Sequence, residues 1–120
     1  MRKVSGLLAF ALFALMIAGC GAKADAPAKK WIDFLDKHKA ALQGGSFDVA
    51  AFKSEGKPIV EELKQVKDTK QNKILMTESV LKEWNRANDE FGAAAGKNAE
   101  AAGAYLDMVL DIAGEDKTAE

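Results

Sequence analysis

The feature that most constrains the fold is a seam of residues that recur at steps of three and four in the second half of the chain. Its members are Ile74, Thr77, Leu81, Trp84, Asn88, Phe91 and Ala95. This spacing places their side chains on one face of a helix and is typical of bundle helices that cross at a shallow angle. A helix over residues 72–94 is therefore expected, with other helices covering its apolar face. Asn88 is polar on this seam, so it needs a partner and either fixes the register or marks a less buried end.

Two more helices are expected on either side of the first. Residues 28–43 carry apolar side chains at helical spacing, and Gly44-Gly45 supplies a stop. Residues 98–113 repeat this pattern and end before Gly114. Gly92–Ala104 is rich in small residues, which let neighbouring helices approach closely.

The remaining apolar segment, residues 48–69, contains Gly56 and Pro58. Proline removes a hydrogen-bond donor and restricts the residue before it, so we expect two short helices, 48–54 and 58–69, rather than one kinked helix.

The fold class that follows is all-α. No stretch alternates apolar and polar residues as a half-buried strand does. We expect a small up-and-down bundle of three to four antiparallel helices over residues 27–114, followed by a frayed tail, 115–120.

The N-terminal segment differs in character from the rest. Arg2 and Lys3 precede twelve unbroken apolar residues, Leu7–Ala18, a length typical of a signal peptide and shorter than the roughly 20 residues that cross a bilayer. The segment closes on Ile17-Ala18-Gly19-Cys20, which resembles the lipobox of bacterial lipoprotein precursors. The resemblance implies cleavage after a signal peptide of residues 1–19 and acylation of the Cys20 thiol and amine.

This resemblance, which is confined to the first twenty residues, also implies a location. The protein would be held in the lipid bilayer of the cell envelope through acylated Cys20, with residues 20–26 as a flexible tether. In Gram-negative lipoproteins an aspartate after the lipidated cysteine favours the inner membrane. This chain has Gly21 there, which favours the outer membrane in such a host.

The distribution of charged residues along the chain limits the classes of partner that it could bind. The chain without its first 19 residues has 15 basic and 18 acidic residues, and the excess of lysine lies before residue 74. Lys23, Lys29 and Lys30 stand nearest the anchor, where they would suit anionic headgroups, although an ordinary solvated surface is the simpler interpretation. The absence of an arginine-rich patch from the sequence argues against nucleic-acid binding.

Catalytic and metal chemistry have little support in the sequence. Cys20 and His38 are the only residues of their kinds, so the chain offers no disulfide, no Ser-His-Asp relay and no two-histidine zinc site. We expect no catalytic residues, no metal and no cofactor. The acidic pairs Asp107–Asp111 and Asp89-Glu90 are interpreted as solvated surface.

Some residues admit a second interpretation. Trp31, His38 and Trp84 fall on the predicted inner faces, where they either fill the core or line a pocket between helices. His38 with Met76 or Met108 would offer ligands for a haem, although no Cys-x-x-Cys-His motif is present. The favoured function is a non-catalytic interaction or structural module with an envelope protein or cell-wall partner. The alternative is a carrier that holds a lipophile or haem between its helices.

Overall fold

The computed structural model describes residues 16–17, 23–67 and 73–114 of the 120-residue chain. Within these ranges it has four helices and two short strands, which occur in the order β1 (Met16–Ile17), α2 (Asp25–Gly44), α3 (Val49–Val66), β2 (Leu75–Met76), α4 (Glu78–Ala95) and α5 (Ala99–Ala113). The strands have two residues each and pair in parallel. The predicted all-α bundle is confirmed, and none of the described helices is long and apolar enough to cross a membrane.

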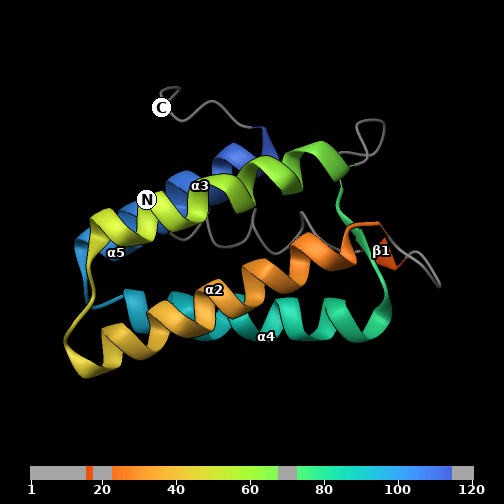
Figure 1. Cartoon of the computed structure of the whole chain (residues 1–120). Coiled ribbons are helices and arrows are strands. Elements are labelled where there is room, and N and C mark those ends of the chain that lie inside the picture. Colours follow the sequence, from red (N-terminus) through yellow and green to blue (C-terminus); the bar gives the residue numbers. More distant parts are fainter. Residues whose placement is uncertain (1–15, 18–22, 68–72, 115–120) are drawn as a thin grey trace.

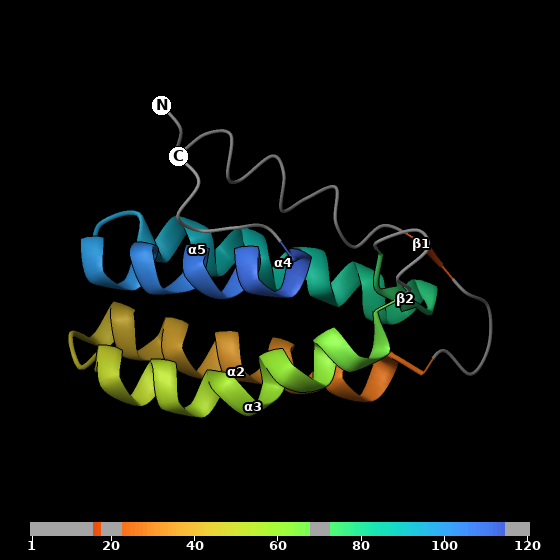
Figure 2. The ribbon, with the colours of Figure 1, turned by 90° about the horizontal axis from the view of Figure 1, so that it is seen from above.

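The bundle consists of two helical hairpins, α2–α3 and α4–α5, packed against each other (Figure 1). Successive helices run in opposite directions, as predicted. The hairpins are nevertheless arranged so that α2 lies beside α4 and α3 lies beside α5, while α3 and α4 occupy opposite corners (Figure 2).

These side-by-side helices run in the same direction. Asp25 at the start of α2 binds Thr77 before the start of α4, and Lys39 late in α2 pairs with Glu90 late in α4. The long sides of the molecule are therefore two parallel pairs of helices.

Helix α3 is continuous through Pro58, so the predicted break into 48–54 and 58–69 is wrong. The proline ring is exposed and its missing N–H costs a single hydrogen bond, whereas the buried face continues on both sides of it. Asp48 caps the start of the helix by accepting hydrogen bonds from the amides of Ala50 and Ala51, at 3.0 and 3.4 Å.

Gly56 serves packing and does not break α3. A Cβ at this position would lie 2.8 Å from both Cε of Met108 and Cζ of Phe34. The glycine thus lets α3 approach α2 and α5 closely.

Two helix starts differ from the sequence predictions. Helix α2 begins at Asp25, inside the predicted tether, because the Asp25 carboxylate accepts hydrogen bonds from the Thr77 amide and hydroxyl at 2.9 and 2.8 Å. Helix α4 begins at Glu78 rather than residue 72, because Leu75–Met76 is extended in β2. The predicted glycine stop of α2 is confirmed, with Gly45 at φ 79°.

All four helices contribute aromatic side chains to the core, alongside a larger number of aliphatic ones. The rings of Phe52 in α3 and Phe91 in α4 stack with centroids 5.3 Å apart, and those of Trp31 in α2 and Tyr105 in α5 stack at 6.4 Å. Both contacts join diagonal corners of the bundle. The centre is therefore occupied by side chains.

Candidate functional site

Asn88 joins three helices inside the core. Its Oδ1 accepts hydrogen bonds from the indole N–H of Trp31 at 3.1 Å and from the hydroxyl of Tyr105 at 2.8 Å. Its Nδ2 donates to the carbonyl of Trp84 at 2.7 Å. The prediction that Asn88 needs a partner is confirmed, and these bonds fix the register of α2, α4 and α5. Burial raises the pKa of the Tyr105 hydroxyl, which keeps that group a donor.

Trp31 and Trp84, two of the three candidate ligand residues, are core side chains. Their exposed fractions are 0% and 1%, and their rings lie 6.2 Å apart. They therefore support the interpretation of core filling over that of a pocket lining.

His38, the third candidate, is also buried, with 4% of its surface exposed. Its Nε2 lies 3.0 Å from Oε1 of Glu55, and its ring packs edge-on against Phe34 and Phe52 at centroid distances of 4.9 and 5.1 Å. Hydrogen bonds from Lys37 and then from His38 hold the pKa of Glu55 below its ordinary value. These contacts tie α2 to α3 and give His38 a structural role.

The structure separates His38 from Met76, one of its two candidate partners as a haem ligand. Met76 adjoins Thr77, which binds Asp25, and His38 lies thirteen positions beyond Asp25 in α2, or about 20 Å along the axis. Met108 lies against Gly56, as does the ring of Phe34. Met76 and His38 are therefore too far apart to ligate one iron.

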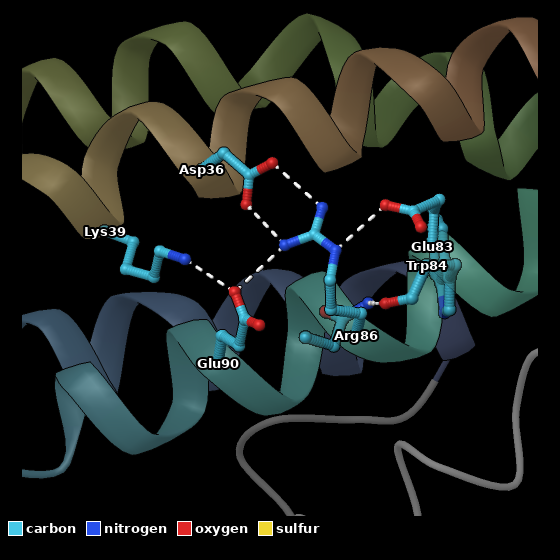
Figure 3. Close-up of polar contacts among 7 residues, drawn as sticks. Asp36, Lys39, Glu83, Trp84, Arg86 and Glu90 are labelled. Atoms are coloured by element: carbon cyan, nitrogen blue, oxygen red, sulfur yellow. Dashed lines mark hydrogen bonds and ion pairs between the residues drawn. The ribbon is translucent and has the colours of Figure 1, made fainter.

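The α2–α4 side of the bundle carries an ion-pair network centred on Arg86 (Figure 3). The guanidinium binds both carboxylate oxygens of Asp36, at 3.2 and 3.0 Å, and one oxygen each of Glu83 and Glu90, both at 2.9 Å. Lys39 adds a second contact to Glu90. The hydrogen bonds with Asp36 and then Glu83 raise the pKa of Arg86, and the bond from Lys39 lowers that of Glu90.

The sequence did not reveal this network, because the Asp36–Arg86 and Lys39–Glu90 pairs join helices that are about fifty residues apart in the chain. Only the spacing of Glu83, Arg86 and Glu90 at steps of three and four signals it. A surface groove of about 390 Å³ adjoins the network, and Asp36, Glu83 and Arg86 are among its lining residues.

A second groove, of about 280 Å³, lies between α3 and α5 on the other long side. Its lining comprises apolar and charged side chains: Val60, Ala104 and Met108, with Lys53, Lys57, Glu61, Asp107 and Asp111. Neither groove is lined by Trp31, His38 or Trp84.

The two acidic pairs have different surroundings. Asp111 accepts a hydrogen bond from Lys64 at 2.8 Å, and Asp107 lies in the α3–α5 groove. Glu90 belongs to the Arg86 network, whereas Asp89 is exposed. Across residues 23–67 and 73–114, no group of three or more histidine, cysteine, aspartate or glutamate side chains is placed to hold a metal ion.

The predicted lipidation site, Cys20, and the tail 115–120 lie outside the described residues. Comparison with known proteins finds no match to a family model, to a curated protein or to a solved structure.

Proposed function

We propose that the protein is a lipid-anchored lipoprotein of the bacterial cell envelope, whose helical bundle is a non-catalytic interaction or structural module. The observation that carries the proposal is the sequence Ile17-Ala18-Gly19-Cys20 directly after a twelve-residue apolar run. Its resemblance to a lipobox supplies the anchor, which two or three acyl chains would make durable.

The start of α2 supports a module held close to the membrane. Asp25 is five residues beyond Cys20. Even when fully extended, a chain of this length spans at most about 17 Å. Lys23, Lys29 and Lys30 are exposed on this part of the chain and would face anionic headgroups. The proposed location is the outer membrane in a Gram-negative host, because Gly21 follows the cysteine.

The interior supports a non-catalytic role. His38, the most versatile acid–base side chain of the sequence, is bound by Glu55 and enclosed by phenylalanine rings. The indoles of Trp31 and Trp84 pack within the bundle. A partner would therefore contact side chains on the outer surfaces of the helices.

Processing would also change the small β-pair. Cleavage before Cys20 removes Met16–Ile17, the strand paired with β2. The processed fold would then depend on its four helices and the aromatic core that they share.

The anchor is tested by comparing the wild-type chain with Cys20→Ala in a bacterial host supplied with labelled palmitate. We expect label and membrane sedimentation for the wild type and the loss of both in Cys20→Ala. Ser46→Ala, in the exposed α2–α3 connection, is the matched control and retains both. Equal labelling of Cys20→Ala would contradict the proposed site.

The interaction role is tested by photo-crosslinking in intact cells from a probe at Lys57 on α3, with a probe at Lys82 on α4 for comparison. A defined envelope protein or cell-wall adduct that forms from Lys57 and exceeds the Lys82 yield supports a partner-binding face. Equal, background-level yields from both probes would count against the interaction role, although the anchor would stand.

A further inference from the structure

The start of α2 and the strand β2 lie together at one end of the bundle (Figure 2). The Asp25 carboxylate accepts hydrogen bonds from the amide and hydroxyl of Thr77, which directly follows β2. At the same end Lys67, just after α3, donates a hydrogen bond to the carbonyl of Ile112 late in α5, at 2.9 Å. We call this end of the bundle the base; it is formed by residues 23–30, 62–67, 73–79 and 111–114. The tether of the proposed anchor therefore enters the fold at the base.

Processing would uncover part of the base. Met16 of β1 pairs with Leu75 of β2. Ile17 pairs in the same way with Met76. Paired residues of neighbouring strands lie about 5 Å apart and share a face, so each residue of β2 adjoins an apolar residue of β1. Cleavage before Cys20 removes both of these neighbours and leaves an unpaired, apolar strand edge at the base.

The charged side chains that remain free at the base are mainly lysines. Lys30 is bound by Glu62 at 3.0 Å, and Lys64 is bound by Asp111 at 2.8 Å. Among the residues that the structure describes, four charged side chains of the base have neither an ion pair nor a hydrogen bond: Lys23, Lys29, Lys73 and Glu78. The three lysines suit the phosphates of lipid headgroups.

The bilayer is the partner that the anchor would hold closest to the base. Asp25 is five residues beyond Cys20, so the acylated residue and the base are at most about 17 Å apart. A tether this short makes contact with the bilayer intramolecular and gives lipid a high effective concentration at the base. A partner captured from solution has no such advantage.

The uncovered edge of β2 suits the surface of a bilayer and not its interior. Unpaired backbone N–H and C=O groups are too costly to place in hydrocarbon. At the boundary between headgroups and acyl chains, water and headgroups satisfy these groups while apolar side chains contact the acyl chains. The side chain of Leu75 is already partly exposed beside this edge.

We propose that the base of the processed protein rests on the bilayer that holds its anchor. Leu75 and the uncovered edge of β2 lie at the headgroup boundary, and the three free lysines face headgroup phosphates. The helices then extend away from the membrane, and both long sides of the bundle stay accessible to a partner. The inference deepens the proposed lipid anchoring and rests on it, because it names the face that contacts the bilayer.

Exposed small residues offer matched positions for a label. Ser79 lies at the base, whereas Ser46 follows α2, about 30 Å away along that helix. Ser54 on α3 and Ala93 on α4 lie on the sides of the bundle, about 18 and 22 Å from the ends of their helices at the base. Each is replaced by cysteine in turn. Because acylation occupies the thiol of Cys20, the new cysteine is the free thiol that the label modifies.

The test uses full-length variants processed in a bacterial host, purified in detergent and labelled with a nitrobenzoxadiazole fluorophore. They are reconstituted into vesicles of phosphatidylethanolamine and phosphatidylglycerol that contain a lipid with a nitroxide near its headgroup. We expect strong quenching of the label in Ser79→Cys and weak quenching in Ser54→Cys and Ala93→Cys. The label in Ser46→Cys should lose no fluorescence above background.

A matched pair of leucine substitutions tests the role of β2. Leu75→Asp, introduced into Ser79→Cys, should reduce the quenching of the label, because a carboxylate at the boundary opposes contact with the acyl chains. Leu42→Asp changes a leucine of similar exposure near the opposite end of the bundle and should leave the quenching unchanged. Thermal unfolding of both variants checks that the fold is retained.

A second matched set tests the lysines. Lys23→Gln combined with Lys29→Gln and Lys73→Gln should also reduce the quenching in Ser79→Cys, because phosphatidylglycerol attracts these charges. Lys82→Gln with Lys97→Gln, at two exposed lysines outside the base, should not reduce it. Equal losses in the two sets would contradict the contact between the base lysines and headgroups.

Two quenching results would overturn the inference: no quenching in Ser79→Cys, or equal quenching in Ser79→Cys and in a variant labelled elsewhere. A disulfide between two chains that forms through Ser79→Cys and not through Ser46→Cys would also overturn it, because a second copy would then cover the base. The intact mass of each preparation reports the anchor separately. An acylated protein without quenching in Ser79→Cys refutes the contact of the base and leaves the anchor intact, whereas a chain without acyl mass refutes the proposed anchor.

Discussion

The indole N–H of Trp31 in α2 donates a hydrogen bond to the side-chain oxygen of Asn88 in α4, at 3.1 Å. The hydroxyl of Tyr105 in α5 donates to the same oxygen at 2.8 Å. One buried acceptor thus satisfies two buried donors from different helices. Removing it should cost more than removing either donor.

We predict that Asn88→Ala lowers the free energy of unfolding by about 2–4 kcal/mol, because it leaves the buried Trp31 indole N–H without its acceptor and removes the shorter hydrogen bond of the Tyr105 hydroxyl. Trp31→Phe removes one donor and should cost less than Asn88→Ala. Urea unfolding at neutral pH measures both. A loss below about 1 kcal/mol for Asn88→Ala would show that the network does not hold the helices together.

Gly56 and Gly103 form a matched pair of helical glycines with opposite surroundings. A Cβ at Gly56 would lie 2.8 Å from Met108 and Phe34, whereas a Cβ at Gly103 would have nothing within 4 Å. We expect Gly56→Ala to destabilise the fold by about 1–3 kcal/mol through overpacking. Gly103→Ala should stabilise it by about 0.5–1 kcal/mol through helix propensity. Thermal unfolding of both variants provides the test, and equal shifts would contradict the close packing of α3.

Stability should fall in acid because of Glu55 and Glu90. Hydrogen bonds from Lys37 and Lys39, respectively, lower the pKa of each carboxylate below its ordinary value of 4.5. A lowered folded-state pKa gives stability that is present above 4.5 and is lost as the pH falls through the folded value. We therefore expect the urea concentration at the midpoint of unfolding to decrease as the pH is lowered below about 4.5.

The double variant Glu55→Gln with Glu90→Gln isolates this effect. Its urea midpoint should vary less between about pH 5 and pH 3 than that of the wild type, because the two shifted carboxylates are absent. Glu100→Gln, at an exposed position early in α5, is the control. Its urea midpoint should fall in acid as much as that of the wild type. If the urea midpoint of the double variant depends on pH as strongly as that of the wild type, the loss of stability in acid does not come from Glu55 and Glu90.

The residue after the cysteine provides a prediction about sorting. In a Gram-negative host, Gly21→Asp should move the protein from outer-membrane to inner-membrane fractions, because aspartate at that position favours retention. Gly21→Ala should leave the distribution unchanged. Density-gradient fractionation measures the effect, and equal distributions of the two variants would contradict the proposed location.

The bundle was predictable because helical spacing and glycine stops are local signals. The seam through Trp84 and Asn88 identified the inner face of α4, and Gly44-Gly45 located the end of α2. Local signals also misled: Gly56 and Pro58 indicated a break, but the tertiary contacts of Gly56 with Met108 and Phe34 make continuity favourable.

The surface sites could not be predicted in this way. The charges that meet Arg86 from α2 and the walls of the α3–α5 groove come from segments about fifty residues apart. Their meeting depends on α2 lying beside α4 and α3 beside α5, and no spacing within one helix encodes that arrangement. Conversely, the resemblance of Ile17-Ala18-Gly19-Cys20 to a lipobox rests on the sequence alone, since Cys20 lies outside the described residues.

The most direct test of the lipid anchor is the intact mass of the protein purified from bacterial membranes. The proposal predicts a chain that starts at Cys20, lacks residues 1–19 and carries the added mass of two or three acyl chains. Cys20→Ala should instead keep its N-terminal residues and carry no acyl mass. A membrane-purified wild-type chain that retains Met1–Gly19 without added lipid would contradict the proposal.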